Sequence, residues 1–283
     1  MQIVKIIVLA LLLSVSQVMA QDIDQKAMDN RSMESDVKSF YAETKQVTQF
    51  IRRFNGEEDI KGIKLSYKDP DYRDAKKRKK FISALFDGEN TSIAESLKRA
   101  FINDVCSTDE PKLLDFHGGD WFGETYVKFK RGNQETFVTL YMELVKENLG
   151  SKWVISDVYY SPFEDMYRRD EGSPARFLHP LSHELDFMNL DKVFNSGIHT
   201  GDYFYQDYKV DKLSIFLYEL HNNTLKFQYV SGVKFHFFQI EGWYFEITEF
   251  NRPGMNKGWL ISNLIKLEDG QKGSLMEFIY HRD

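Results

Sequence analysis

The sequence is poor in the features that identify most enzymes and nucleic-acid-binding proteins. Its 283 residues contain one cysteine, Cys106, so the chain cannot form an internal disulfide. It has no glycine-rich phosphate-binding loop, no Gly-x-Ser-x-Gly motif and no Cys–His pair that suggests catalysis. Basic residues are also in deficit, with 37 Lys and Arg against 43 Asp and Glu and a net charge of −6. Because nucleic-acid binding is driven by basic surfaces that release counterions, this balance argues against a nucleic-acid partner.

The N-terminal apolar run is too short for a comfortable membrane span, which takes about 20 residues. It covers residues 6–15, between Lys5 and the small-residue sequence Val18-Met19-Ala20, which is the order of a signal peptide cleaved before Gln21. Lys5 is the only charged residue in the segment 1–20. Its removal leaves 36 basic and 43 acidic residues, a net charge of −7. A retained anchor is the alternative, but a lipoprotein anchor is disfavoured because the residue directly after the cleavage point is Gln21 and not a cysteine. The sequence therefore predicts a periplasmic or secreted protein with no membrane span after cleavage.

What the sequence does contain is aromatic residues and alternating strands. Aromatic residues make up 15% of the chain, and the stretch from Val127 to Asp157 predicts three antiparallel strands. Val233-Lys234-Phe235 echoes Val127-Lys128-Phe129, and the sequence at 259–262 echoes that at 153–156, both at an offset of 106 residues. The apolar faces of the middle strands agree only at an offset of 105, which requires a residue added in one hairpin and lost in the next. The echoes predict two related β-rich units.

Three helices are predicted before the first strands. Apolar residues recur at helical spacing over residues 34–54, and Asn55-Gly56 ends that helix. The basic run 76–80 then leads into a helix that buries Phe81, Ile82 and Leu85; the alternative is a patch that binds anionic envelope polymers. The third helix is predicted to start at Ser92, which forms a capping box with Glu95.

The remaining segments are predicted from the same patterns. In the middle strand of the first unit, Val138, Leu140, Met142 and Leu144 line one face, which we expect to meet helices. The other face, with Phe137 and Tyr141, is either solvated or packed on another sheet or protomer. A charged linker is predicted over 161–176, followed by a helix near 181–194. Strands are then predicted at 213–220, 225–230, 233–240, 243–250, 259–267 and 275–280.

Three helices followed by a curved antiparallel sheet that ends in Lys152-Trp-Val-Ile-Ser-Asp-Val resembles the NTF2-like (cystatin-like) superfamily over about residues 34–160. The resemblance implies an α+β fold with NTF2-like helices packed on the sheet, followed at 177–283 by a second β-rich unit of related topology. Residues 1–20 are then the signal peptide and 21–33 a mobile leader. An exported chain of this composition also resembles secreted proteins of gut Bacteroidetes. NTF2-like folds serve either as enzyme pockets or only as binding and dimerisation surfaces.

The resemblance also suggests candidate site residues. NTF2-like isomerases use inward carboxylates and tyrosines on the sheet to abstract and stabilise protons. Asp157 is accordingly a candidate general base and Tyr159 or Tyr41 a candidate donor, the alternative being that Asp157 is a carboxylate at the rim of the sheet. His117 and Trp121 flank a glycine-rich bend, which either lines a pocket mouth or marks a β-bulge.

No cofactor or metal site is predicted. His179 and His183 have an i, i+4 spacing that can hold a metal, but Pro180 places His179 before the start of the helix. Cys106 ends a helical pattern beside Val105, and we expect a buried, inert thiol.

Two classes of function remain. The first is an exported, non-enzymatic binding or interaction protein of the bacterial cell envelope, whose partner is an unknown small molecule or an envelope protein; a homodimer through a sheet face is compatible with it. The alternative is a small-molecule lyase or isomerase that uses an NTF2-like pocket with Asp157 as general base. The two differ in whether Asp157 points into an enclosed cavity or out to water.

Overall fold

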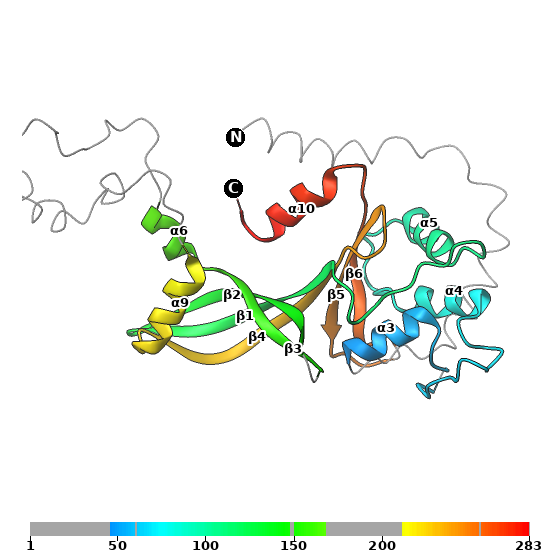
Figure 1. The fold of residues 1–283 in the computed structure, drawn as a ribbon, viewed down its shortest axis with the longest axis horizontal. Helices are drawn as coiled ribbons and strands as arrows, with labels where there is room; N and C mark the ends of the chain where they lie inside the picture. The colour runs from blue at the N-terminus through cyan, green and yellow to red at the C-terminus, as the bar shows by residue number, and fades with distance from the viewer. Residues whose placement is uncertain (1–45, 60, 148–149, 168–210, 255, 283) are drawn as a thin grey trace, which may run out of the picture.

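A single open antiparallel sheet organises the fold. The computed structural model describes residues 46–282 except 60, 148–149, 168–210 and 255 (Figure 1). In this part the chain is α+β, with six helices and six strands in the order β3-β2-β1-β4-β5-β6. The strands are β1 (Trp121–Arg131), β2 (Gln134–Glu147), β3 (Gly150–Tyr159), β4 (Leu225–Phe237), β5 (Trp243–Phe250) and β6 (Gly258–Lys266).

The two sets of predicted strands form two three-stranded meanders in this one sheet. β1 pairs antiparallel with β4 along its whole length, from Trp121 opposite Phe237 to Arg131 opposite Leu225. The segments 127–129 and 233–235, which echo each other in sequence, therefore lie on the two central strands. The strands predicted at 225–230 and 233–240 are one continuous strand, β4, because its ladder to β1 carries through the residues between them.

Side chains alternate between the two faces of the sheet, and residues directly opposite one another on neighbouring strands share a face. We define the first face by the β1 residues Trp121, Gly123, Thr125, Val127 and Phe129. The second face is defined by Phe122, Glu124, Tyr126, Lys128 and Lys130. The aliphatic residues predicted to meet helices lie on the first face, where Val138 and Leu140 are buried beside Phe216 of a helix.

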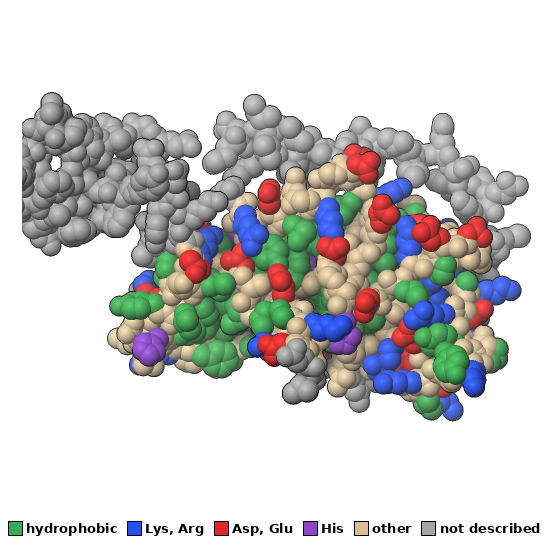
Figure 2. All heavy atoms as spheres, viewed as in Figure 1, with side chains coloured by type: hydrophobic (Ala, Val, Ile, Leu, Met, Phe, Trp, Pro, Cys, Tyr) green, Lys and Arg blue, Asp and Glu red, His purple; other side chains and the backbone are tan. Residues whose placement is uncertain are grey.

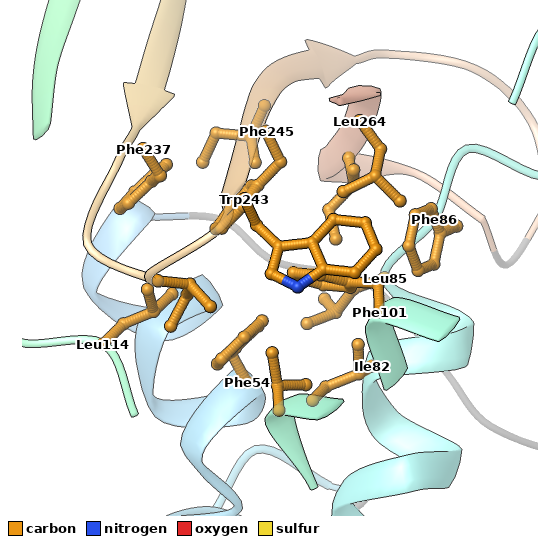
Figure 3. Packing of buried hydrophobic residues seen from close by; sticks show 14 of the residues in the cluster. Phe54, Ile82, Leu85, Phe86, Phe101, Leu114, Phe237, Trp243, Phe245 and Leu264 are labelled. Carbon is orange, nitrogen blue, oxygen red and sulfur yellow. The ribbon is translucent and has the colours of Figure 1, made fainter. Parts of the chain in front are cut away.

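The first face is covered at its β5–β6 end by α3 (Val47–Asn55), α4 (Ala75–Ala84) and α5 (Glu95–Val105) (Figure 1). The core is aromatic: Trp243 packs edge-on against Phe101 with ring centroids 5.2 Å apart, and Phe54 stacks on Phe245 at 6.0 Å (Figure 3). Burying each such side chain contributes about 1.5–3 kcal/mol. The predicted C-terminus of the first helix is confirmed, since Gly56 follows α3 in the left-handed conformation.

The predicted start of the third helix is wrong. α5 begins at Glu95 after an N-cap at Ala94, whose side chain makes no capping hydrogen bond. Ser92 instead donates from both its backbone nitrogen and its hydroxyl to Asn90 Oδ1, at 2.8 and 2.5 Å. The asparagine therefore holds Ser92 in a turn that precedes the helix.

The other end of the first face is covered by α6 (Ser161–Tyr167) and α9 (Lys212–His221). The strand predicted at 213–220 is wrong, since this segment is α9. Short apolar runs do not by themselves distinguish a strand from a helix. Here Asp211 accepts hydrogen bonds from the backbone nitrogens of Leu213 and Ser214 as an N-cap, and Phe216 packs against Phe129 at 5.7 Å.

The second face is partly covered by α10 (Gln271–Ile279). The strand predicted at 275–280 is wrong, because this segment turns back as a helix. Its C-cap, Tyr280, is buried against Phe122 and Tyr141, and the Tyr141 hydroxyl donates to the Ile279 carbonyl at 2.6 Å. None of the helices in the described ranges is both long enough and apolar enough to cross a membrane.

Candidate functional site

Asp157 lies on β3, opposite Tyr141 on the second face. Its Oδ2 accepts hydrogen bonds from Arg282 Nη2 and Nε at 2.6 and 3.1 Å, and its Oδ1 accepts one from the Val158 nitrogen at 2.8 Å. The carboxylate therefore binds the C-terminal tail at an edge strand of the sheet.

The other predicted site residues do not converge on Asp157. Tyr159 stacks on His281 at 4.0 Å, whereas His117 lies 3.0 Å from the Ser151 hydroxyl through its Nδ1. Trp121 is buried on the first face and stacks on Phe237 at 5.2 Å. Asp157 and Tyr159 thus lie on the opposite face of the sheet from Trp121. Tyr41, His179 and His183 lie outside the described residues.

A buried polar network occupies the middle of the second face. His236 on β4 lies between Glu124 on β1 and Tyr244 on β5, with its Nε2 2.9 Å from Glu124 Oε2 and its Nδ1 2.8 Å from the Tyr244 hydroxyl oxygen. The Tyr126 hydroxyl donates to the other carboxylate oxygen at 2.7 Å. An ionised carboxylate only accepts hydrogen bonds, so Nε2 donates to Glu124, while Nδ1 is within hydrogen-bond distance of the Tyr244 hydroxyl.

The electrostatics of the network follow from its burial. Burial raises the pKa of Glu124, but the hydrogen bonds from His236 and Tyr126 outweigh it and hold that pKa below its ordinary value. Burial, followed by the negative charges of Glu246 and Glu124, raises the pKa of Tyr244. Burial and its hydrogen bond to Glu124 raise the pKa of Tyr126 as well. The carboxylate is therefore ionised and the two hydroxyls keep their protons near neutral pH.

This network is a structural feature rather than an accessible catalytic site. The His236 side chain is 2% exposed and both its ring nitrogens have partners. The network joins β1, β4 and β5 at the boundary between the two meanders. Sequence reasoning missed it because Glu124 and His236 are 112 residues apart and meet only through the register of β1 on β4.

Beyond the network, the second face carries two exposed aromatic side chains on either side of a lysine whose own side chain is only 16% exposed. Phe137 on β2 and Tyr229 on β4 both lie opposite Lys128 on β1, and we call these three residues the aromatic–lysine row. Lys128 Nζ lies 5.9 Å from the Phe137 ring centroid and 5.5 Å from the Tyr229 ring centroid. The rings are 59% and 51% exposed.

Further charged residues surround the row. Lys130 lies opposite Lys226 at the end of the same face, and both are exposed. Lys128 Nζ also forms an ion pair with Glu135 Oε2 at 2.5 Å. Figure 2 shows hydrophobic side chains on the part of the molecule that carries β1 to β4, with Lys and Arg beside them. The arrangement can hold a ligand that has both ring surfaces and negative charge.

The basic run at 76–80 lies in α4, and the helix predicted there is confirmed, with Phe81, Ile82 and Leu85 buried. Its arginine, Arg78, is also buried and donates to the carbonyls of Phe54 and Lys112 at 3.2 and 2.6 Å. A cavity of about 490 Å³ lies beside α4, lined by both acidic residues and lysines. Lys77 is paired with Asp71, so acidic neighbours offset part of the positive charge.

Among the residues that the structure describes, no group of three or more His, Cys, Asp or Glu side chains is placed to hold a metal ion. Comparisons of the chain with protein-family models, curated proteins and solved structures found no match.

Proposed function

We propose that the protein is an exported, non-enzymatic binding protein of the bacterial cell envelope that holds its ligand on the aromatic–lysine row. The observation that supports this proposal is the pair of exposed rings on either side of Lys128. Exposed aromatic surface rimmed by polar groups is typical of interaction sites. The strands fix the backbone positions of the two residues, so no loop has to be ordered when a ligand binds.

The contacts of the candidate catalytic residues support binding over catalysis. Asp157 is engaged by Arg282, whereas a general base needs a free path to the proton that it abstracts. The proposal includes an NTF2-like origin for the α3–α5 helices and the meander that follows them, supported by the order of these elements.

Retention on isolated cell envelopes tests the proposal. Phe137→Ala/Tyr229→Ala should lose most of the retention of the mature protein, because both rings of the row are removed. Leu217→Ala/Tyr218→Ala is the matched control, since these α9 side chains are 67% and 68% exposed and lie outside the row. Equal retention of the two variants would contradict the proposal. A turnover activity that Asp157→Asn abolishes would favour the lyase or isomerase alternative.

The site of processing is checked separately. N-terminal sequencing of protein recovered from outside the cytoplasm should begin at Gln21. A chain that keeps residues 1–20 would contradict the exported form proposed above.

A further inference from the structure

We infer that the ligand of the aromatic–lysine row is a carboxylated polysaccharide, whose sugar rings pack on Phe137 and Tyr229 and whose carboxylates pair with the lysines around them. The inference rests on the proposed function, since it names the class of ligand that the same surface binds.

The charge of the surface selects an anion. Lys128, Lys130 and Lys226 gather at one end of the second face, where Glu135 lies opposite Lys130. This end is therefore locally positive on a chain whose net charge is −6. A local positive patch raises the concentration of an anionic ligand at that place, even on a protein that is acidic overall.

The spacing of the two rings favours a polymer over a small acid. Phe137 and Tyr229 lie on the strands that flank β1, two interstrand spacings apart, or about 9.5 Å. The Lys128 ammonium group lies between them. A ligand with a single small ring can contact only one of the two aromatic side chains. A polymer of rings that crosses β1 can contact both and place a carboxylate beside Lys128.

The neighbouring side chains indicate that the rings of the ligand are sugars. The next row of the second face carries Thr139 opposite Tyr126, so a threonine hydroxyl lies beside the aromatic side chains, while the Tyr126 hydroxyl is bonded to Glu124. A pyranose ring presents an apolar C–H face to an aromatic ring and hydroxyls at its edge, which matches this combination. Single-stranded nucleic acid also stacks on aromatic residues, and a comparison with oligothymidylate distinguishes it from a carboxylated polysaccharide.

Glu135 competes with the ligand's carboxylate for Lys128. In its ion pair with Lys128, 67% of the Glu135 side chain but only 16% of the Lys128 side chain is accessible, so the glutamate is the partner that faces solvent. Ion pairs that solvent can reach contribute little to stability. A ligand carboxylate can replace Glu135 at Lys128 without unfolding any element. Removal of Glu135 is therefore expected to strengthen binding.

Titration calorimetry of the mature protein with polygalacturonate tests this assignment. Lys128→Gln should weaken binding about tenfold, as expected for the loss of one charge-assisted contact. Glu135→Gln should strengthen binding, and binding should weaken as salt is raised. Lys146→Gln is the matched control, because Lys146 is exposed on the first face at the end of β2, and its affinity should not change.

Neutral dextran and oligothymidylate separate the alternatives. If dextran binds as tightly as polygalacturonate, the lysines do not recognise carboxylates and the inference is overturned. Tighter binding of oligothymidylate would assign the row to nucleic acid instead. If polygalacturonate does not bind, or binds equally to Lys128→Gln, while Phe137→Ala/Tyr229→Ala still abolishes envelope retention, the proposed function stands and the ligand class is wrong.

Discussion

At the scale of single residues, Glu124 is a charged side chain in the interior of the sheet. It is buried at the boundary of the two meanders and accepts hydrogen bonds from His236 and Tyr126. A buried carboxylate is stable only when donors compensate for lost hydration. We therefore expect the stability of the β1–β4 pairing to depend on whether Glu124 is ionised.

The stability of the protein should consequently depend on pH through Glu124. Because the folded-state pKa of Glu124 lies below its ordinary value of 4.5, the unfolded state takes up the proton first as pH falls. This contribution to the free energy of unfolding is fully present above about pH 4.5 and is lost as pH falls through the folded-state pKa. Denaturant titrations from pH 3 to 7 should show a shallower pH dependence for Glu124→Gln.

Glu249→Gln is the control for this experiment, because Glu249 is an exposed glutamate on β5 of the same sheet. Its pH dependence should match that of the unmodified protein. An unchanged slope in Glu124→Gln would show that the network does not couple protonation to folding.

Cys106 should be unreactive in the folded protein. The residue is 2% exposed, and burial raises the pKa of its thiol despite the nearby positive charges of Arg78 and Lys79. A thiol-specific dye should label the native protein far more slowly than the urea-unfolded protein, because only unfolding exposes a thiol that forms the thiolate readily. Comparable rates in the two states would contradict this placement.

At the scale of secondary-structure elements, helix starts are decided by which side chain reaches the free backbone nitrogens. Asp74 accepts a hydrogen bond from the Lys77 nitrogen at 2.9 Å and caps α4. Ser92 has the sequence context of a cap but bonds to Asn90 instead. The sequence spacing predicts a capping residue, but that residue caps the helix only if no other local acceptor binds it first.

This difference is measurable in stability. Asp74→Ala should lower the free energy of unfolding by about 1 kcal/mol, the usual cost of a lost N-cap. Ser92→Ala should change it by no more than about 0.5 kcal/mol, as expected at an exposed position outside a helix. Urea denaturation of both variants checks the pair. A larger loss in Ser92→Ala than in Asp74→Ala would restore the capping box predicted from the sequence.

The two strands wrongly predicted at 213–220 and 275–280 share one cause. Both runs are apolar and short, so strand and helix periodicity fit them about equally. α9 and α10 cover aromatic parts of the sheet through Phe216 and Tyr280. Their helical form thus depends on surfaces made by β1, β2 and β4, which local sequence does not describe.

At the scale of the whole molecule, the two meanders share one sheet. β1 and β4 pair over the full length of β1, so the hydrogen bonds at the centre of the sheet belong to both halves. Each half therefore loses its central neighbour if the other unfolds. We expect the described elements to unfold together.

The expected result is a single cooperative transition. Leu140→Ala, beside α9, and Phe245→Ala, beside α3–α5, should each shift the transitions seen by tryptophan fluorescence and far-UV circular dichroism together. Losses of about 2–5 and 3–5 kcal/mol are expected for these buried side chains. Two separable transitions, with each variant moving only one, would instead indicate two independent domains.

The sequence by itself determined features that depend on neighbours a few residues away. The end of α3 at Gly56, the helix that contains the basic run, and the alternation of β2 all follow from local conformational preference and periodicity. The tertiary structure alone decided that β1 pairs with β4, and thereby that Lys128 lies between Phe137 and Tyr229 while Glu124 meets His236. Strand register depends on the packing of the whole sheet, and a shift of one residue would move every one of these side chains to the other face.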